Sequence, residues 1–247
     1  MTPSITQSLI QPDHEKDAQV KIEVLKKIYG DDKVQEAIDY LTYRNVQELP
    51  KNEDPNHPIL YVFRHGETED NAHMIFSGWR DVGLTEKGVE QAGVLAEKIK
   101  DKKIQMLVTS DQERAIDTMK VAISKNEYAK TLEIHQDPRL RERSYGDWQG
   151  ESKLVAQLTD PEGLHKVRRG YYDKPPNAES LEETVKRVGN FLDEVIPLMK
   201  RENINVAISC HGNSIRGIRQ YFEKLSNEEA AEIETPLGKD YAAYSIT

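Results

Sequence analysis

A histidine beside an arginine stands at the end of an apolar run in the first third of the chain. Residues 59–63 are rich in β-branched and aromatic side chains and predict a buried strand, and Arg64, His65 and Gly66 follow directly. In open α/β sheets, ligands bind at the carboxyl ends of the strands. Gly66 permits a sharp turn and leaves room for a ligand to approach the imidazole. These residues therefore predict a site where an imidazole and a fixed cation meet an anion.

The same order of strand, histidine, glycine and helix occurs again near the carboxyl end. Residues 206–210 predict a strand, His211 and Gly212 follow it, and a helix is expected from Asn213. A single histidine at a strand end is usually a structural residue. Two of them on one sheet edge, the first beside Arg64, favour a functional site instead.

Two helix starts should add positive charge at this edge. Ser110 or Asp111 is expected to cap a helix, and Arg114 lies one turn further on. Helix amino termini present free N–H groups and the positive end of the helix dipole. Together with the helix from Asn213, these groups are expected to converge on one oxyanion.

The elements that must hold these residues alternate between strands and helices. Further strands are predicted at residues 104–109, 132–135 and 241–246, and further helices at 85–101, 180–202 and from 226. The last two helices open with Ser-x-x-Glu capping boxes, whereas residues 71–83 and 139–150 are expected to be loops. The alternation predicts an α/β fold, a three-layer α/β/α sandwich around a mostly parallel sheet.

Residues 1–57 are predicted to form a small helical extension in front of a catalytic domain at 58–247. The first twelve residues are expected to be disordered, helices are expected at 13–29 and 31–43, and 51–58 is predicted to be a linker. The extension carries no chemical motif. We expect a helical pair that packs on the main domain or on a partner, with independent ligand binding as the alternative.

The composition excludes several classes of protein. The net charge of −9 argues against a general binder of nucleic acid or acidic membranes. No apolar stretch is long enough to span a bilayer, and the amino terminus lacks the pattern of a secretory signal. The single cysteine, Cys210, is expected to be a small buried residue and suits a reducing compartment. We therefore expect a cytoplasmic enzyme with no nucleic-acid or membrane partner.

Five segments together resemble the histidine phosphatase superfamily, and within it most closely the 2,3-bisphosphoglycerate-dependent phosphoglycerate mutases. The resemblance covers nearly everything from Pro58 onward. It is strong because Arg-His-Gly-Glu occurs with Glu-Arg-Ser-Tyr-Gly-Asp-Trp-Gln-Gly and His-Gly-Asn-Ser-Ile-Arg-Gly. The matching segments are Leu60 to Thr68, Phe76 to Glu86, Thr109 to Thr118, Arg141 to Lys153, and Ser209 to Gly217.

The resemblance implies a catalytic role for five residues. His65 would be the nucleophile that forms a phosphohistidine, and Glu142 would give and take the proton of the substrate oxygen. Arg64, Arg114 and His211 would hold the phosphoryl oxygens. Without the surrounding motif, Glu142 would more simply be a surface carboxylate paired to a neighbouring arginine. No metal is required, because fixed cations supply the neutralisation.

By the same resemblance, nine further residues would line the substrate pocket. A small substrate that carries both carboxylate and phosphate needs a second cationic patch, which the lysine and the two arginines of this set would supply. The nine residues are Asn71, Ser77, Gly78, Tyr145, Lys153, Arg168, Arg169, Gly212 and Asn213.

The implied activity is interconversion of 3-phosphoglycerate and 2-phosphoglycerate, as in glycolysis, with 2,3-bisphosphoglycerate as the priming phosphoryl donor. The alternative is a phosphatase that hydrolyses small phosphate monoesters through the same intermediate, and a third is an inactive binding or scaffold protein. Asp70 and Ile75 depart from the mutase pattern, and the segment after Arg169 is short, which favours the phosphatase. The resemblance also allows a homodimer.

Overall fold

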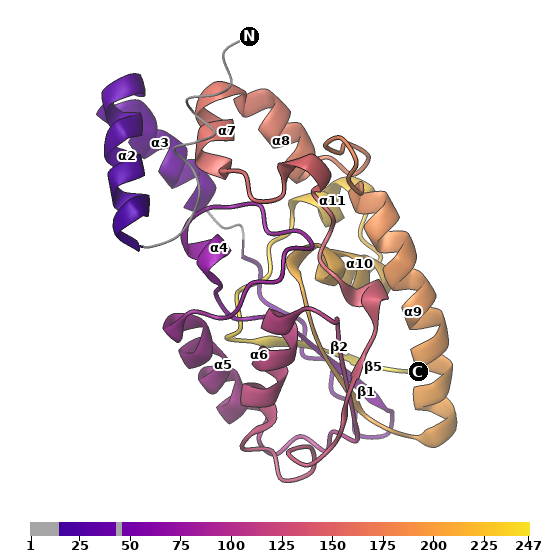
Figure 1. Cartoon of the computed structure of the whole chain (residues 1–247). Helices are drawn as coiled ribbons and strands as arrows, with labels where there is room; N and C mark the ends of the chain where they lie inside the picture. Colours follow the sequence, from indigo (N-terminus) through magenta and orange to yellow (C-terminus); the bar gives the residue numbers. More distant parts are fainter. Residues whose placement is uncertain (1–14, 43–45) are drawn as a thin grey trace.

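The computed structural model describes residues 15–42 and 46–247 and contains, within them, a five-stranded sheet in the order β3-β2-β4-β1-β5 (Figure 1). All neighbouring pairs are parallel except β1 and β5, which are antiparallel. Helices cover both faces, so the predicted α/β fold with a mostly parallel sheet is confirmed. The strands are β1 (Ile59–Arg64), β2 (Met106–Thr109), β3 (Ile134–Gln136), β4 (Val206–Cys210) and β5 (Tyr241–Ser245).

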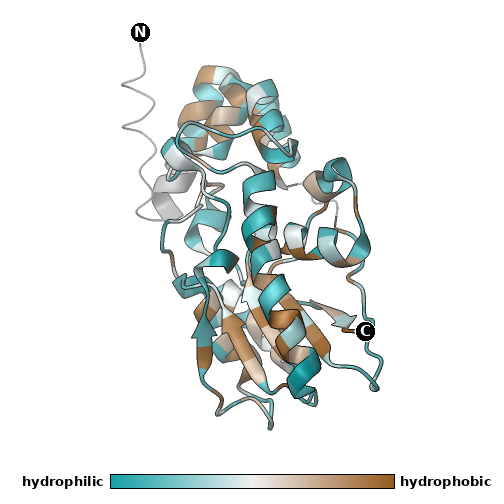
Figure 2. Ribbon diagram, turned by 90° about the vertical axis from the view of Figure 1, so that its right-hand side faces the viewer, coloured by the Kyte–Doolittle hydropathy of each residue, from teal (hydrophilic) through white to brown (hydrophobic). Residues whose placement is uncertain are grey.

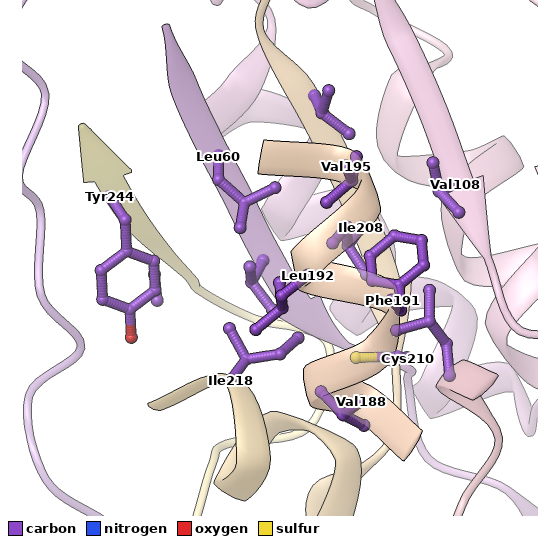
Figure 3. Close-up of a cluster of buried hydrophobic side chains, with 14 of the residues drawn as sticks. Leu60, Val108, Val188, Phe191, Leu192, Val195, Ile208, Cys210, Ile218 and Tyr244 are labelled. Atoms are coloured by element: carbon purple, nitrogen blue, oxygen red, sulfur yellow. The ribbon is translucent and has the colours of Figure 1, made fainter. Parts of the chain in front are cut away.

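The three layers follow from the alternation of side chains along the buried strands. Leu60 and Val62 of β1 pack on one face against helices α9 (Leu181–Glu202) and α10 (Gly212–Glu223) (Figure 3). Tyr61 of the same strand points to the other face, against α5 (Glu86–Ile99) and α6 (Glu113–Ile123). Cys210 lies in the first of these clusters and is fully buried, as expected. The central strands are thus apolar on both sides.

Several helix starts follow the expected capping chemistry. Thr85 accepts the Gly88 N–H at the start of α5, and Ser180 and Glu183 form the predicted capping box of α9. The second predicted box, at Ser226, opens α11 (Asn227–Glu232).

Figure 2 shows the hydrophobic segments concentrated on the strands and the hydrophilic ones on outward helix surfaces. In the described part of the chain, no helix has the length and apolarity needed to cross a membrane.

The predicted cap of α6 is wrong. The helix begins one or two residues later than expected, with Gln112 at its N-cap and no side-chain cap bond. The Ser110 hydroxyl is bonded to His211, and the Asp111 carboxylate is held by the guanidinium of Arg141 at 2.7 Å. Both side chains are engaged by His211 and Arg141 from other segments and therefore do not cap the helix.

The structure also contains short helices that the sequence patterns did not predict. Thr68 caps α4 (Glu69–Ala72) at the start of the expected loop, because its hydroxyl and the Asn71 side chain bond each other's backbone. Two more helices follow the 139–150 loop, namely α7 (Lys153–Thr159) and α8 (Pro161–Arg169). Ser152 caps the first, and Asp160 both ends it and caps the second.

The amino-terminal extension forms two helices, α2 (Glu15–Tyr29) and α3 (Asp31–Thr42), of which α3 lies beside α7 (Figure 1). The predicted helix ends at residues 13–14 and 43, and the predicted disorder of 1–12, fall outside the described residues. The segment predicted as a linker is tied to the edge of the sheet, because the N–H of Asn52 donates to Ala243 of β5 and the Ala243 N–H donates to Pro50. The boundary at residue 57 remains a prediction.

Candidate active site

The register of the two central strands brings the two histidines together. Arg64 of β1 pairs with Cys210 of β4, so His65 and His211 leave the sheet at the same level. Their ring centroids lie 5.0 Å apart with the planes inclined by 54°. The prediction that both lie at one edge of the sheet is confirmed.

The hydrogen bond of His65 identifies which ring nitrogen is available for chemistry. Its Nδ1 lies 2.7 Å from the carbonyl oxygen of Gly66, and because a carbonyl only accepts, Nδ1 carries the proton of the neutral ring. The lone pair is therefore on Nε2. Burial lowers the pKa of His65 well below 6.5, and the nearby charges of Arg114 and Arg64 lower it further. The ring is thus unprotonated at neutral pH and can act as a nucleophile.

The loop that carries His65 is fixed by backbone contacts. A Cβ on Gly66 would lie 2.3 Å from the carbonyl oxygen of Gly88, and one on Gly238 would lie 2.9 Å from the Gly66 Cα. Real side chains do not fit at such distances, so glycine is required for this close approach. In addition, the Gly66 N–H donates to the Thr118 hydroxyl at 2.9 Å. The loop that carries His65 is therefore positioned by the backbone of Gly88, the backbone of Gly238 and the hydroxyl of Thr118.

Two arginines present unused donors beside the histidines. Arg114 is 1% exposed, and its two terminal nitrogens donate to the carbonyls of Arg80 and Gly78 at 2.9 Å each. Its Nε and that of Arg64 are buried without a hydrogen-bond partner among the described residues. Buried donors are normally paired. The unpaired donors therefore fit an anionic group bound at this place.

His211 lies behind His65 and is fully buried. Its Nε2 is 2.7 Å from the Ser110 hydroxyl, whereas Nδ1 has no partner within the described part of the chain. Burial and the charge of Arg114 lower the pKa of His211 well below 6.5. The pocket lining does not include this residue, so its contact with a phosphoryl oxygen remains a prediction.

The Glu142 carboxylate is fixed by three donors. Its Oε1 accepts from the backbone N–H of Arg143 at 2.7 Å and from the backbone and side chain of Asn213 at 3.1 and 2.8 Å. The Trp79 indole and the Arg187 guanidinium donate to its backbone carbonyl. The alternative, a surface ion pair with an adjacent arginine, is wrong, because the residue is 8% exposed and its neighbours pair elsewhere. Its carboxyl faces the pocket in a defined position, as a proton donor requires.

One pocket gathers all of the predicted site residues except His211. Their gathering agrees with the prediction, while the role of each residue remains a prediction. The pocket is lined by Arg64, His65, Asn71, Ser77, Gly78, Arg114, Glu142, Tyr145, Lys153, Arg168, Arg169, Gly212 and Asn213, and also by four residues not predicted, Leu41, Met74, Arg216 and Glu234.

The second half of the pocket is strongly basic, with one carboxylate among the cations. Glu234 lies 2.8 Å from Arg169, 3.7 Å from Arg216 and 4.0 Å from Arg64. Burial and the adjacent Arg169 lower the pKa of Arg168, whose side chain is only partly exposed. An anionic group placed here would meet desolvated cations, where electrostatic attraction is strongest.

The four pocket residues that were not predicted differ in how far a sequence pattern could have identified them. Arg216 lies one helical turn after Asn213, inside the His-Gly-Asn-Ser-Ile-Arg motif, and that spacing could have identified it. Glu234 occurs in an acidic segment with no motif, and Met74 in a predicted loop. Leu41 belongs to the extension, where no chemical role was expected. Only packing over long sequence distances reveals the last three.

Among the described residues, no group of three or more His, Cys, Asp or Glu side chains is arranged to hold a metal ion.

A family model for the "Histidine phosphatase superfamily (branch 1)" matches residues 60–246. A 2,3-bisphosphoglycerate-dependent phosphoglycerate mutase from Cytophaga hutchinsonii is 36% identical over 182 residues, which cover 73% of this chain and 84% of that protein. The enzyme of the same name from Parvibaculum lavamentivorans is 36% identical over 185 residues, covering 73% and 87%.

Solved structures also resemble the chain. A mycobacterial glucosyl-3-phosphoglycerate phosphatase, solved in complex with VO3, superposes with a TM-score of 0.67 at 25% identity. The match covers 75% of this chain and 92% of that one. The sequence relatives are thus named mutases, and this structural relative is named a phosphatase.

Proposed function

Since the chain belongs to the histidine phosphatase superfamily (branch 1), we propose that this phosphoryl-transfer enzyme interconverts 3-phosphoglycerate and 2-phosphoglycerate through a phosphohistidine at His65. The names of its sequence relatives support the substrate. 2,3-Bisphosphoglycerate would supply the phosphoryl group that first loads the histidine. Its charge fits the unpaired buried donors of Arg64 and Arg114.

The observation that carries the proposal is the excess of positive charge in one pocket. Among the described residues, six cationic side chains line it against two carboxylates. Arg64 and Arg114 stand beside the nucleophile and suit a phosphoryl group. A phosphate ester whose alcohol part is uncharged would not require the other four cations. They suit a substrate that also carries a carboxylate. The four are Lys153, Arg168, Arg169 and Arg216.

In the first step, the Nε2 lone pair of His65 attacks phosphorus and the bond from phosphorus to the ester oxygen breaks. Protonated Glu142 gives its proton to the departing oxygen. Arg64 and Arg114 stabilise the charge on the phosphoryl oxygens during transfer. The leaving alcohol departs neutral, the phosphoryl group stays on nitrogen, and Glu142 becomes a carboxylate.

In the second step, the Glu142 carboxylate removes the proton from an acceptor hydroxyl, whose oxygen attacks phosphorus while the bond to Nε2 breaks. If the acceptor is the free hydroxyl of 3-phosphoglycerate, the product is 2,3-bisphosphoglycerate, and return of its other phosphoryl group to His65 by the first step releases 2-phosphoglycerate, which completes the isomerisation. If the acceptor is water, the result is hydrolysis. Retention of the sugar acid by the second cationic group therefore decides between the two outcomes.

The test is a coupled assay of 3- to 2-phosphoglycerate conversion, with and without added 2,3-bisphosphoglycerate. Conversion that depends on the primer is expected. His65→Ala should abolish it, while His135→Ala, at an exposed position on β3, serves as the control and should not. Incubation with radiolabelled 2,3-bisphosphoglycerate should leave an acid-labile label only where His65 is present. A blank isomerisation assay beside efficient hydrolysis of p-nitrophenyl phosphate would overturn the mutase assignment.

A phosphomonoesterase is the second candidate, and Glu234 favours it. This carboxylate neutralises part of the charge of Arg169 and Arg216, which weakens the hold on a substrate carboxylate. The similarity to a glucosyl-3-phosphoglycerate phosphatase supports the same alternative. The assay above distinguishes the two activities.

A further inference from the structure

The amino-terminal extension contributes a wall of the substrate pocket. Leu41, near the end of α3, lines the pocket together with Met74 and is 2% exposed. These two aliphatic side chains border a lining that is otherwise mostly polar. The family match begins only at residue 60, so Leu41 belongs to a segment outside the part of the chain that resembles the superfamily.

Helix α3 is fixed to the elements that carry the pocket cations. Val34 and Leu41 pack in one buried cluster with Leu154 and Leu158 of α7, the helix that begins with Lys153. Figure 1 shows α3 lying directly beside α7. The position of Leu41 is therefore set by the same packing that places Lys153.

Two further contacts connect the extension to the basic half of the pocket. The Tyr40 hydroxyl lies 3.0 Å from Nδ1 of His165 on α8, the helix that ends with Arg168 and Arg169. After α3, Val46 forms an isolated parallel bridge with Glu234. The extension thus contacts α7, α8 and Glu234, the segments that carry Lys153, the Arg168-Arg169 pair and the pocket carboxylate.

We propose that Leu41 is a specificity-determining residue, which contacts the part of the substrate remote from phosphorus and restricts the pocket to compact phosphate esters. The proposal rests on phosphoryl transfer at this pocket but not on the mutase assignment. An isobutyl group offers no hydrogen bond and excludes water, so it favours a short, densely charged substrate beside the arginines. It leaves no room for an aryl or glycosyl group in the same place.

The test measures binding by the full-length protein, independently of turnover. Isothermal titration with inorganic phosphate and with phenylphosphonate compares a ligand that ends at the phosphoryl site with one that extends beyond it. Leu41→Ala should tighten phenylphosphonate binding by about tenfold, the effect of a few methylenes in a pocket, and leave phosphate binding unchanged. Leu41→Val, a milder truncation, should give an intermediate change.

The matched control is Val34→Ala. Val34 is completely buried in the same helix and the same cluster but does not line the pocket, so its truncation should lower thermal stability without altering the ratio of the two affinities. The proposal would be overturned if the ratio of phenylphosphonate affinity to phosphate affinity were the same in folded Leu41→Ala, Val34→Ala and wild-type protein. Failure of the proposed function would appear differently, as no turnover of any phosphate ester by a protein that still binds phosphate.

Discussion

Acid should destabilise this protein through the two buried histidines of the site. His65 and His211 are 2% and 0% exposed, and burial with nearby arginines lowers both pKa values well below 6.5. In the unfolded chain the same rings titrate near ~6.5. Below that pH the unfolded chain binds protons that the folded protein does not. Folding free energy from these groups is therefore fully present above pH ~6.5 and is lost as the pH falls.

The magnitude follows from this difference in proton binding. Each ring that stays neutral costs about 1.4 kcal/mol of stability per pH unit below ~6.5. At pH 5 the loss is about 2 kcal/mol for one histidine and about 4 kcal/mol for the pair. Because domains are stable by only about 5–15 kcal/mol, such a loss is readily measured.

Urea denaturation at pH 7 and pH 5, in buffer without phosphate, tests the reasoning. His65→Asn and His211→Asn should each reduce the pH-dependent loss by about 2 kcal/mol, whatever their effect on stability at pH 7. His135→Asn, at an exposed position, should leave the loss unchanged. If the double variant of His65 and His211 loses as much stability on acidification as wild type, the two rings are not held neutral and the argument is refuted.

Three substitutions test other parts of the site. Glu142→Gln should lower kcat for 3-phosphoglycerate by roughly 10²–10⁴-fold. It should lower kcat for p-nitrophenyl phosphate much less, because nitrophenolate leaves without a proton. Equal losses for the two substrates in steady-state kinetics would argue against an acid role. Glu234→Gln should tighten inorganic phosphate several-fold in low-salt calorimetry, because it removes a carboxylate from among the arginines, and unchanged affinity would contradict this. Gly88→Ala should cost about 1–3 kcal/mol in urea denaturation, because its Cβ would lie 2.1 Å from a backbone oxygen. Gly93→Ala in the same helix meets nothing within 4 Å and should stabilise the protein by about 0.5–1 kcal/mol; equal effects of the two substitutions would exclude a steric cause.

The sequence predicts the sheet and the histidine pair because their signals are local. Apolar runs that end at His65 and His211 define two strands, and a parallel sheet places equivalent strand ends at one edge. The capping boxes of α9 and α11 are likewise short patterns with a direct physical cause.

What the sequence could not predict depends on contacts between distant segments. Asp111 has the right type for a helix cap, but Arg141 holds its carboxylate. The helices α7 and α8 are short and depend for their stability on packing against α3 and its neighbours. Leu41 has the ordinary spacing of a buried helix residue, and only the folded chain shows that one side of it faces the pocket.

The glycine contacts around His65 also bear on how the free energy of catalysis is distributed. Because Gly66, Gly88 and Gly238 meet main chain to main chain, the loop that carries the imidazole is positioned mainly by backbone contacts, and the ring is oriented by its bond to the Gly66 carbonyl. Ordering the nucleophile is therefore part of folding and does not have to be repeated in each catalytic cycle. The binding free energy of a substrate is then available for its own alignment and for displacing water from the arginines.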